Sequence, residues 1–381
     1  MEKMIRTGML ATLMLGSGAL AACGPTLVNF DPNNAQSIDV RPVGGQKVFC
    51  PGSSFQVELL VKLQNGSMCS STDRDVGCQG QKDAVVNPKM IRLEGEPGGR
   101  TGDLEKFVWS TPGDILATAD TGVTLRAWLE KQVEGQYQKS VIGESNLTPV
   151  YACRMGDTFG GGSAGAPGPD VKIAITTLKT PYYENAALIR VESGGERAYY
   201  ISPTADQAVR IVSRGGDGYV GETGKTGAEG EDGRDASSGS PVCTRGEAGR
   251  DGQDGGPGGP GGDGGRGGAI RIFLDKAASD DLKGRVLAES VGGSAGPGGA
   301  GGPGGNGGTG GRGISGQGCQ SSSDVNGPDG RPGRQGQPGP AGRPGQAGPD
   351  PVFATAARQA LFADEMDIIK RIESAKRKIA K

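Results

Sequence analysis

The sequence predicts a mainly β protein. It consists of an immunoglobulin-like β-sandwich, a glycine-rich polyproline II or polyglycine II (collagen-like) region with short interposed strands, and a C-terminal helix. Three observations support this fold class. Apolar and polar residues alternate between turn residues over 30–212, glycine occupies every third position in four runs between 215 and 350, and apolar residues recur at helical spacing after Pro351.

The composition restricts both the fold and the function. Glycine provides 73 of 381 residues and hydrophobic residues only 34%, so part of the chain has too little apolar surface for an ordinary core. The formal net charge of −2 gives no basic surface for nucleic acid. Histidine is absent, which excludes a Ser-His-Asp triad, a histidine base and a histidine-ligated metal. We therefore expect no enzyme activity, no cofactor and no metal.

The N-terminus has the pattern of an export signal. Lys3 and Arg6 precede the apolar stretch 7–20, which is too short for a stable membrane span. The following Leu-Ala-Ala-Cys23 resembles the lipobox of bacterial lipoproteins, which implies a signal peptide over 1–22, a diacylated Cys23 and a lipid-anchored tether over 23–29. Gly24 in place of aspartate implies, in that family, the outer membrane of the cell envelope.

Six cysteines remain after Cys23, an even number that indicates disulfides in an exported protein. Six cysteines allow fifteen connectivities, and their positions favour one. Cys50 and Cys153 sit near the ends of the first strand-rich region, and Cys69 and Cys78 bracket a short polar loop. Cys243 and Cys319 both lie in interruptions between glycine runs, so we expect them to pair and to tie two turns.

Residues 30–154 are predicted to form the sandwich. The clearest strand is 54–63, which starts after Pro51-Gly52 and ends at Asn65-Gly66. Six further strands are expected at 38–41, 90–94, 106–109, 115–118, 122–130 and 150–153. A Gly/Pro linker is expected over 155–170 and a short β-strand region over 171–214, with strands at 171–178, 187–192, 198–201 and 209–213.

The glycine runs cover 215–235, 246–269, 293–313 and 327–350. Glycine at every third position lies on one side of a polyproline II helix and allows a close neighbour. Three arrangements remain open: a bundle of helices within one chain, a collagen trimer, and a disordered linker. The matched run lengths and the scarcity of proline in the first three runs favour the bundle and a monomer. The proline-rich fourth run is expected at an edge, because proline lacks the N–H that an interior helix must pair.

Two expected strands, 269–275 and 284–290, separate the second and third runs. The lipobox, the repeated Gly-Gly-x runs and the Ile-Arg-Ile-Phe-Leu-Asp strand together resemble the glycine-rich, collagen-like surface lipoproteins predicted in myxobacteria. The resemblance covers about 1–30 and 187–350. It implies a cell-surface lipoprotein and brings no catalytic residues.

Two further features have simple interpretations. Aspartates recur in the runs and suggest calcium, but arginines are interleaved and the calcium-binding nonapeptide is not matched, so solvated positions are expected; these aspartates are Asp217, Asp232, Asp235, Asp251, Asp254 and Asp263. Residues 351–381 are expected to form an amphipathic helix that packs on its own protein. An oligomerising coil or a basic contact with an anionic surface are the alternatives.

The sequence thus predicts a non-enzymatic, membrane-anchored surface lipoprotein with a structural or adhesive role. Its partners would be membrane lipid through Cys23, and a surface protein or a polysaccharide. The alternative is a binding module, in which the 30–154 sandwich recognises a carbohydrate or a protein and the glycine region forms a stalk. An aromatic-lined groove in the sandwich would favour this alternative.

Overall fold

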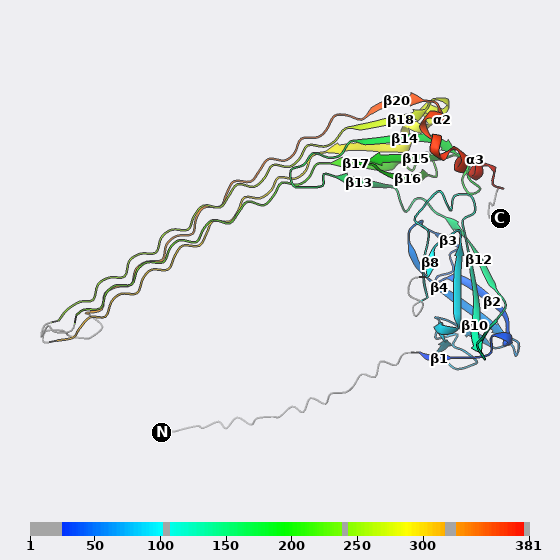
Figure 1. The fold of residues 1–381 in the computed structure, drawn as a ribbon, viewed down its shortest axis with the longest axis horizontal. Coiled ribbons are helices and arrows are strands. Elements are labelled where there is room, and N and C mark those ends of the chain that lie inside the picture. The colour runs from blue at the N-terminus through cyan, green and yellow to red at the C-terminus, as the bar shows by residue number, and fades with distance from the viewer. Residues whose placement is uncertain (1–24, 102–106, 238–242, 317–324, 377–381) are drawn as a thin grey trace, which may run out of the picture.

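The computed structural model describes residues 25–101, 107–237, 243–316 and 325–376. The chain forms two β units side by side, and a thin bundle made of the four glycine runs projects far from the second unit (Figure 1). The molecule is mainly β with short helices near the C-terminus, as predicted.

The first β unit contains two main sheets. One has the order β11-β10-β12-β3 with β7 also paired to β10, and the other has the order β2-β4-β9-β8 with β5 also paired to β4. A small parallel pair, β1 with β6, lies beside them. The bounds are β1 (Thr26–Val28), β2 (Ala35–Pro42), β3 (Val48–Phe49), β4 (Ser54–Leu63), β5 (Met68–Ser70), β6 (Ala84–Val86), β7 (Ile91–Glu96), β8 (Arg100–Thr101), β9 (Val108–Ser110), β10 (Val123–Val133), β11 (Gln136–Lys139) and β12 (Gly143–Pro149).

Alternate residues of both main sheets fill one shared core. Val57, Leu59 and Val61 of β4 face Leu125 and Leu129 of β10 in a single buried cluster. The predicted strand 54–63 has the observed bounds of β4. Two predicted strands are wrong. Residues 115–118 form turns, although their apolar side chains are buried, and 150–153 follow the end of β12 without entering a sheet.

The second β unit has two layers. The larger sheet has the order β16-β15-β14-β18-β20, and the smaller has the order β13-β17-β19. Their facing apolar residues, including Ile173, Ile189, Ile211 and Ile272, form a second core. The bounds are β13 (Gly156–Gly160), β14 (Val171–Leu178), β15 (Ala186–Ser193), β16 (Glu196–Ser202), β17 (Val209–Arg214), β18 (Ile270–Asp275), β19 (Val286–Val291) and β20 (Val352–Ala356).

The C-terminal segment covers part of the outer face of the larger sheet. Leu361, Phe362, Ile369 and Ile372 are buried in a third cluster with residues of that sheet and of the first β unit. The segment differs from the single helix predicted over 351–381. It begins with β20, because a strand edge is available there, and the helices α2 (Arg358–Leu361) and α3 (Met366–Ser374) follow; α1 (Ser279–Leu282) lies between β18 and β19. Residues 377–381 lie outside the described part.

The predicted linker 155–170 is instead an ordered connection at the base of the bundle. It contains β13, which pairs with β17, and its glycine amides bond to the end of β17 and to the second run: Gly161 N donates to Arg214 O and Gly168 N donates to Arg266 O. Glycine and proline here serve close packing, which composition alone does not distinguish from flexibility.

Each glycine run continues a strand of the two-layer unit (Figure 1). The first and third runs extend β17 and β19, which are parallel neighbours in the smaller sheet. The second run leads into β18 and the fourth into β20, which are parallel neighbours in the larger sheet. The two layers therefore fix which runs lie beside each other before the bundle begins.

The predicted disulfides Cys50–Cys153 and Cys69–Cys78 are present, with Cα–Cα distances of 6.1 and 3.9 Å. Cys243 is also disulfide-bonded, but its predicted partner Cys319 lies outside the described residues.

We expect Cys50–Cys153 to stabilise the protein more than Cys69–Cys78, because it closes a loop of 103 residues instead of 9. Chain entropy gives about 4–5 kcal/mol for the long loop and about 2.5 kcal/mol for the short one. Urea unfolding of the Cys50→Ser/Cys153→Ser and Cys69→Ser/Cys78→Ser variants measures this difference. An equal or larger loss for the second variant would contradict the expectation.

Candidate functional site

The most distinctive surface of the molecule is the bundle, whose four runs are joined by backbone hydrogen bonds at every third residue. The first run bonds to the third and the second, the second and third bond to each other, and the fourth bonds to the second and the third. Neighbours within a layer are parallel and neighbours across the layers are antiparallel. The central runs are therefore the second and the third, each with three neighbours, and the first and fourth runs form the edges.

This arrangement explains why the triplets of the second run pair two amides each, although the second amide need not belong to glycine, since Glu247, Arg250 and Gln253 also bond to the first run. In the second run, Gly255 N donates to Arg334 O of the fourth run at 2.8 Å, and Gly256 N donates to Lys225 O of the first run at 2.7 Å. One triplet thus uses two amides in opposite directions, and both positions lie against a neighbouring backbone. The edge runs need only one such position per triplet. The proline-rich fourth run lies at an edge, as predicted.

Most glycine positions of the runs leave no room for a side chain. A Cβ on Gly302 would overlap the Lys225 carbonyl oxygen, and a Cβ on Gly255 would overlap the Gly302 carbonyl oxygen. Gly256 is less crowded, since its nearest foreign atom would be Lys225 N at 3.2 Å. The remaining triplet positions, such as Asn306, are exposed. Substitutions at neighbouring positions of one run should therefore differ greatly in effect.

The six aspartates of the first two runs accept hydrogen bonds from the backbone of the parallel neighbouring run. Each carboxylate takes an N–H that the lattice leaves over, at 2.6–2.7 Å; the pairs are Asp217 with Ser294, Asp232 with Thr309, Asp235 with Arg312, Asp251 with Arg331, Asp254 with Arg334 and Asp263 with Arg343. Their side chains are exposed, as expected, but they also pair backbone amides. Sequence reasoning missed this role.

The sequence does contain a signal for these bonds. The paired residues are separated by 77 positions between the first and third runs and by 80 between the second and fourth. At these separations every one of the six aspartates faces a residue that has an N–H. The prolines at the same positions face residues other than aspartate; they are Pro297, Pro303, Pro328, Pro340 and Pro349, opposite Val220, Thr226, Ala248, Pro260 and Ala269.

Asp217 has a pKa below its ordinary value, mainly because its carboxylate accepts from Ser294 N. Arg214, whose Nη2 lies 2.7 Å from Asp217 Oδ1, acts in the same direction. A lowered pKa in the folded state means that the ionised form is stabilised by folding. The contribution is complete above the ordinary aspartate pKa and is lost as the pH falls through the lowered value.

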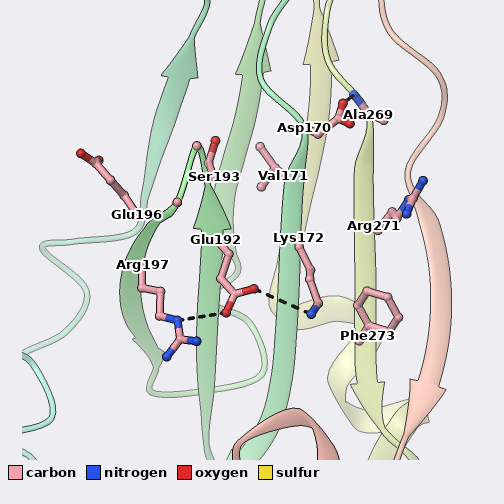
Figure 2. A pocket seen from close by; sticks show the side chains of 12 residues that line it. Asp170, Val171, Lys172, Glu192, Ser193, Glu196, Arg197, Ala269, Arg271 and Phe273 are labelled. Atoms are coloured by element: carbon pink, nitrogen blue, oxygen red, sulfur yellow. Dashed lines mark hydrogen bonds and ion pairs between the residues drawn. The ribbon is translucent and has the colours of Figure 1, made fainter. Parts of the chain in front are cut away.

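A second candidate site is a hollow of about 590 Å³ on the outer face of the larger sheet, beside the base of the bundle (Figure 2). Glu192 reaches between Arg197 and Lys172, with N–O distances of 3.1 and 3.7 Å. The Lys172 ammonium also lies 5.5 Å from the centre of the Phe273 ring. These groups largely satisfy one another, so the network joins β14, β15 and β16 and offers little to a ligand.

Three further expectations concern lipidation, a membrane span and a metal site. Cys23, the predicted lipidation site, lies outside the described residues. Among residues 25–101, 107–237, 243–316 and 325–376, no helix is long and apolar enough to cross a bilayer. The described part of the chain also contains no group of three or more cysteine, aspartate or glutamate residues placed to hold a metal ion.

No protein-family model, curated protein or solved structure matches the chain.

We expect Gly255→Ala to disrupt the bundle and Gly256→Ala, the matched control in the same triplet, to be mild. The first Cβ would overlap a carbonyl oxygen of the third run, and the second needs only a small shift of Lys225 N. Overpacking of this kind costs about 1–3 kcal/mol. Thermal melting, monitored by circular dichroism, measures the difference. Equal melting temperatures for the two variants would contradict the close backbone packing of the runs.

The Asp217 bond should make the stability of the bundle pH-dependent. Because the folded state lowers the pKa of Asp217, Asp217→Ala should reduce the melting temperature more at pH 7 than at a pH below that lowered pKa, where the wild-type carboxylate is protonated too. Asp350→Ala, an exposed aspartate without a backbone partner among the described residues, is the control. A loss that is the same at both pH values would argue against the bond.

Proposed function

We propose that the protein is a non-enzymatic lipoprotein of the cell envelope, anchored at the outer membrane through Cys23, whose bundle acts as a rigid spacer with a structural or adhesive role. The observation that carries this proposal is the continuous hydrogen-bond lattice between the four runs. A segment whose amides are paired at every third residue resists bending, whereas a glycine-rich linker without such bonds is flexible.

We further propose that the runs are polyglycine II helices and that the first β unit is an immunoglobulin-like sandwich. A three-residue repeat of bonds agrees with the three residues per turn of polyproline II, whose rise of about 3.1 Å per residue gives each run a length of about 65–75 Å. The glycine amides bond within the one chain, which supports a monomer over a collagen-type trimer. The spacer would present its surface to another protein or a polysaccharide.

The alternative function, recognition by the 30–154 sandwich, has less support. Trp109 is fully buried and packs where Gly95 and Gly99 leave room for its ring. The Trp128 ring is covered by the Lys139 ammonium, 5.0 Å from its centre. Neither indole of the chain is therefore an open aromatic platform of the kind that sugar-binding grooves use.

The proposal is tested with two changes that separate anchoring from spacing. Cys23→Ser should move the protein from the membrane to the soluble fraction, because the lipid chains supply the membrane affinity. Membrane fractionation with immunoblotting measures this. If Cys23→Ser stays in the membrane fraction, lipid anchoring through Cys23 is contradicted.

Gly302→Val should leave the protein on the membrane but remove its structural or adhesive effect, measured as cell aggregation or attachment. The branched side chain would overlap the Lys225 carbonyl oxygen and separate the runs. Asn306→Val, at an exposed position of the same run, is the control. Normal attachment with Gly302→Val, in a protein whose bundle is shown to be melted, would refute the spacer role.

A further inference from the structure

A cavity of about 820 Å³ lies at the ends of the strands opposite the bundle. It is formed by the end of β14, the start of β15, the segment after β16 and residues 281–285. Tyr183, one of its lining residues, also contacts the first β unit, since its hydroxyl donates to Pro149 O at 3.3 Å and its ring centre lies 5.5 Å from that of Tyr151. The cavity thus sits near the junction of the two β units, a common location for small-molecule sites.

Arg285 lines this cavity and is buried, with 6% of its surface exposed. Its guanidinium donates to Asn185 O at 2.7 Å, to Ser202 Oγ at 3.2 Å and to Ser202 O at 3.5 Å, while its buried Nε has no partner. No carboxylate of the described residues forms an ion pair with it. This differs from Arg190, the other buried arginine, whose Nη1 lies 2.9 Å from Glu365 Oε2.

An unpaired cation in a buried position is costly, so proteins normally supply a counter-ion. Burial lowers the pKa of Arg285, which reflects this cost. The guanidinium has five N–H groups in a planar fork that matches an oxyanion, and its three neutral acceptor atoms use only part of them. Asp281 and Asp206 act on this charge and, against the effect of burial, raise the pKa of Arg285, but neither pairs with the guanidinium directly.

We propose that the cavity binds a small acidic sugar whose carboxylate pairs with Arg285. The proposal is independent of the lipid anchor and of the spacer role. A carboxylate satisfies the free donors of the guanidinium bidentately, and the polar lining suits the hydroxyl groups of a sugar.

The charges around the cavity favour a single carboxylate over a phosphate. Lys179 adds a second cation, but Glu184, Asp281 and Glu373 also line the cavity. Glu373 is neutralised by Arg358, 2.6 Å away. Two negative charges on a ligand would be repelled by Asp281, whereas one negative charge can be balanced by Arg285 and acidic side chains can accept from hydroxyl groups.

The wall of the cavity includes the ring of Tyr182, whose burial raises its pKa to about 12. Its hydroxyl therefore stays protonated at neutral pH and adds no charge to the cavity. Leu178 and Leu282 supply apolar surface on the same lining. An aromatic ring, apolar contacts and polar groups in one cavity are the usual composition of a site for a small ligand.

The test is isothermal titration of the full mature chain with glucuronate, glucose and inorganic phosphate. Glucuronate should bind saturably and more tightly than either of the others. Arg285→Lys should weaken glucuronate binding at least tenfold, since lysine cannot form the bidentate pair. Arg271→Lys, an exposed arginine beside the hollow of Figure 2, is the matched control and should bind as the wild type does.

Because Arg285 also holds two loops, a second variant guards against misfolding. Asp281 is exposed, so Asp281→Asn should fold and should tighten glucuronate binding while leaving glucose unchanged. Absence of saturable glucuronate binding to the wild-type chain would overturn the proposal. So would equal binding of glucose, tighter binding of phosphate, or the same affinity in Arg285→Lys with its fold intact.

Discussion

The bundle depends on one constraint: every third residue must bring its backbone against the backbone of another run. At these positions a Cβ would overlap a carbonyl oxygen of the adjacent run, so only glycine fits. Gly302 shows both halves of the constraint, since its N–H bonds to Gly256 O at 2.9 Å and its missing Cβ leaves room for the Lys225 carbonyl. The positions that do not meet a neighbour are free to carry charge or proline.

The two-layer β unit supplies what glycine alone cannot, namely a fixed order and register. Val209 and Val286 pair in the smaller sheet with the same sequence separation as Asp217 and Ser294 in the bundle. The register set by strand pairing is therefore passed on to the runs. Aspartate carboxylates then accept hydrogen bonds from backbone N–H groups that do not bond to another backbone, so these charged residues of the bundle also stabilise its backbone.

Much of the fold follows from sequence patterns with one physical cause. Alternation predicts β4 and β14 with their observed bounds, because one face of each strand is buried. The bundle's neighbours, the packed 155–170 segment and strand β20 depend on tertiary contacts that no local pattern contains. At the candidate sites, the spacing of the glycines and cysteines in the sequence is enough to predict their roles. The aspartate bonds require the register between distant runs, and the unpaired Arg285 is visible only once its surroundings are buried.

Hydrogen exchange of the glycine amides tests the central claim most directly. The lattice predicts strong protection of amides such as Gly256 and Gly302, whose N–H groups are bonded to a neighbouring run. Amides of solvent-facing positions without an aspartate partner, such as Ala300, should exchange much faster. Uniformly fast exchange throughout 215–350 in the monomeric protein would contradict the account.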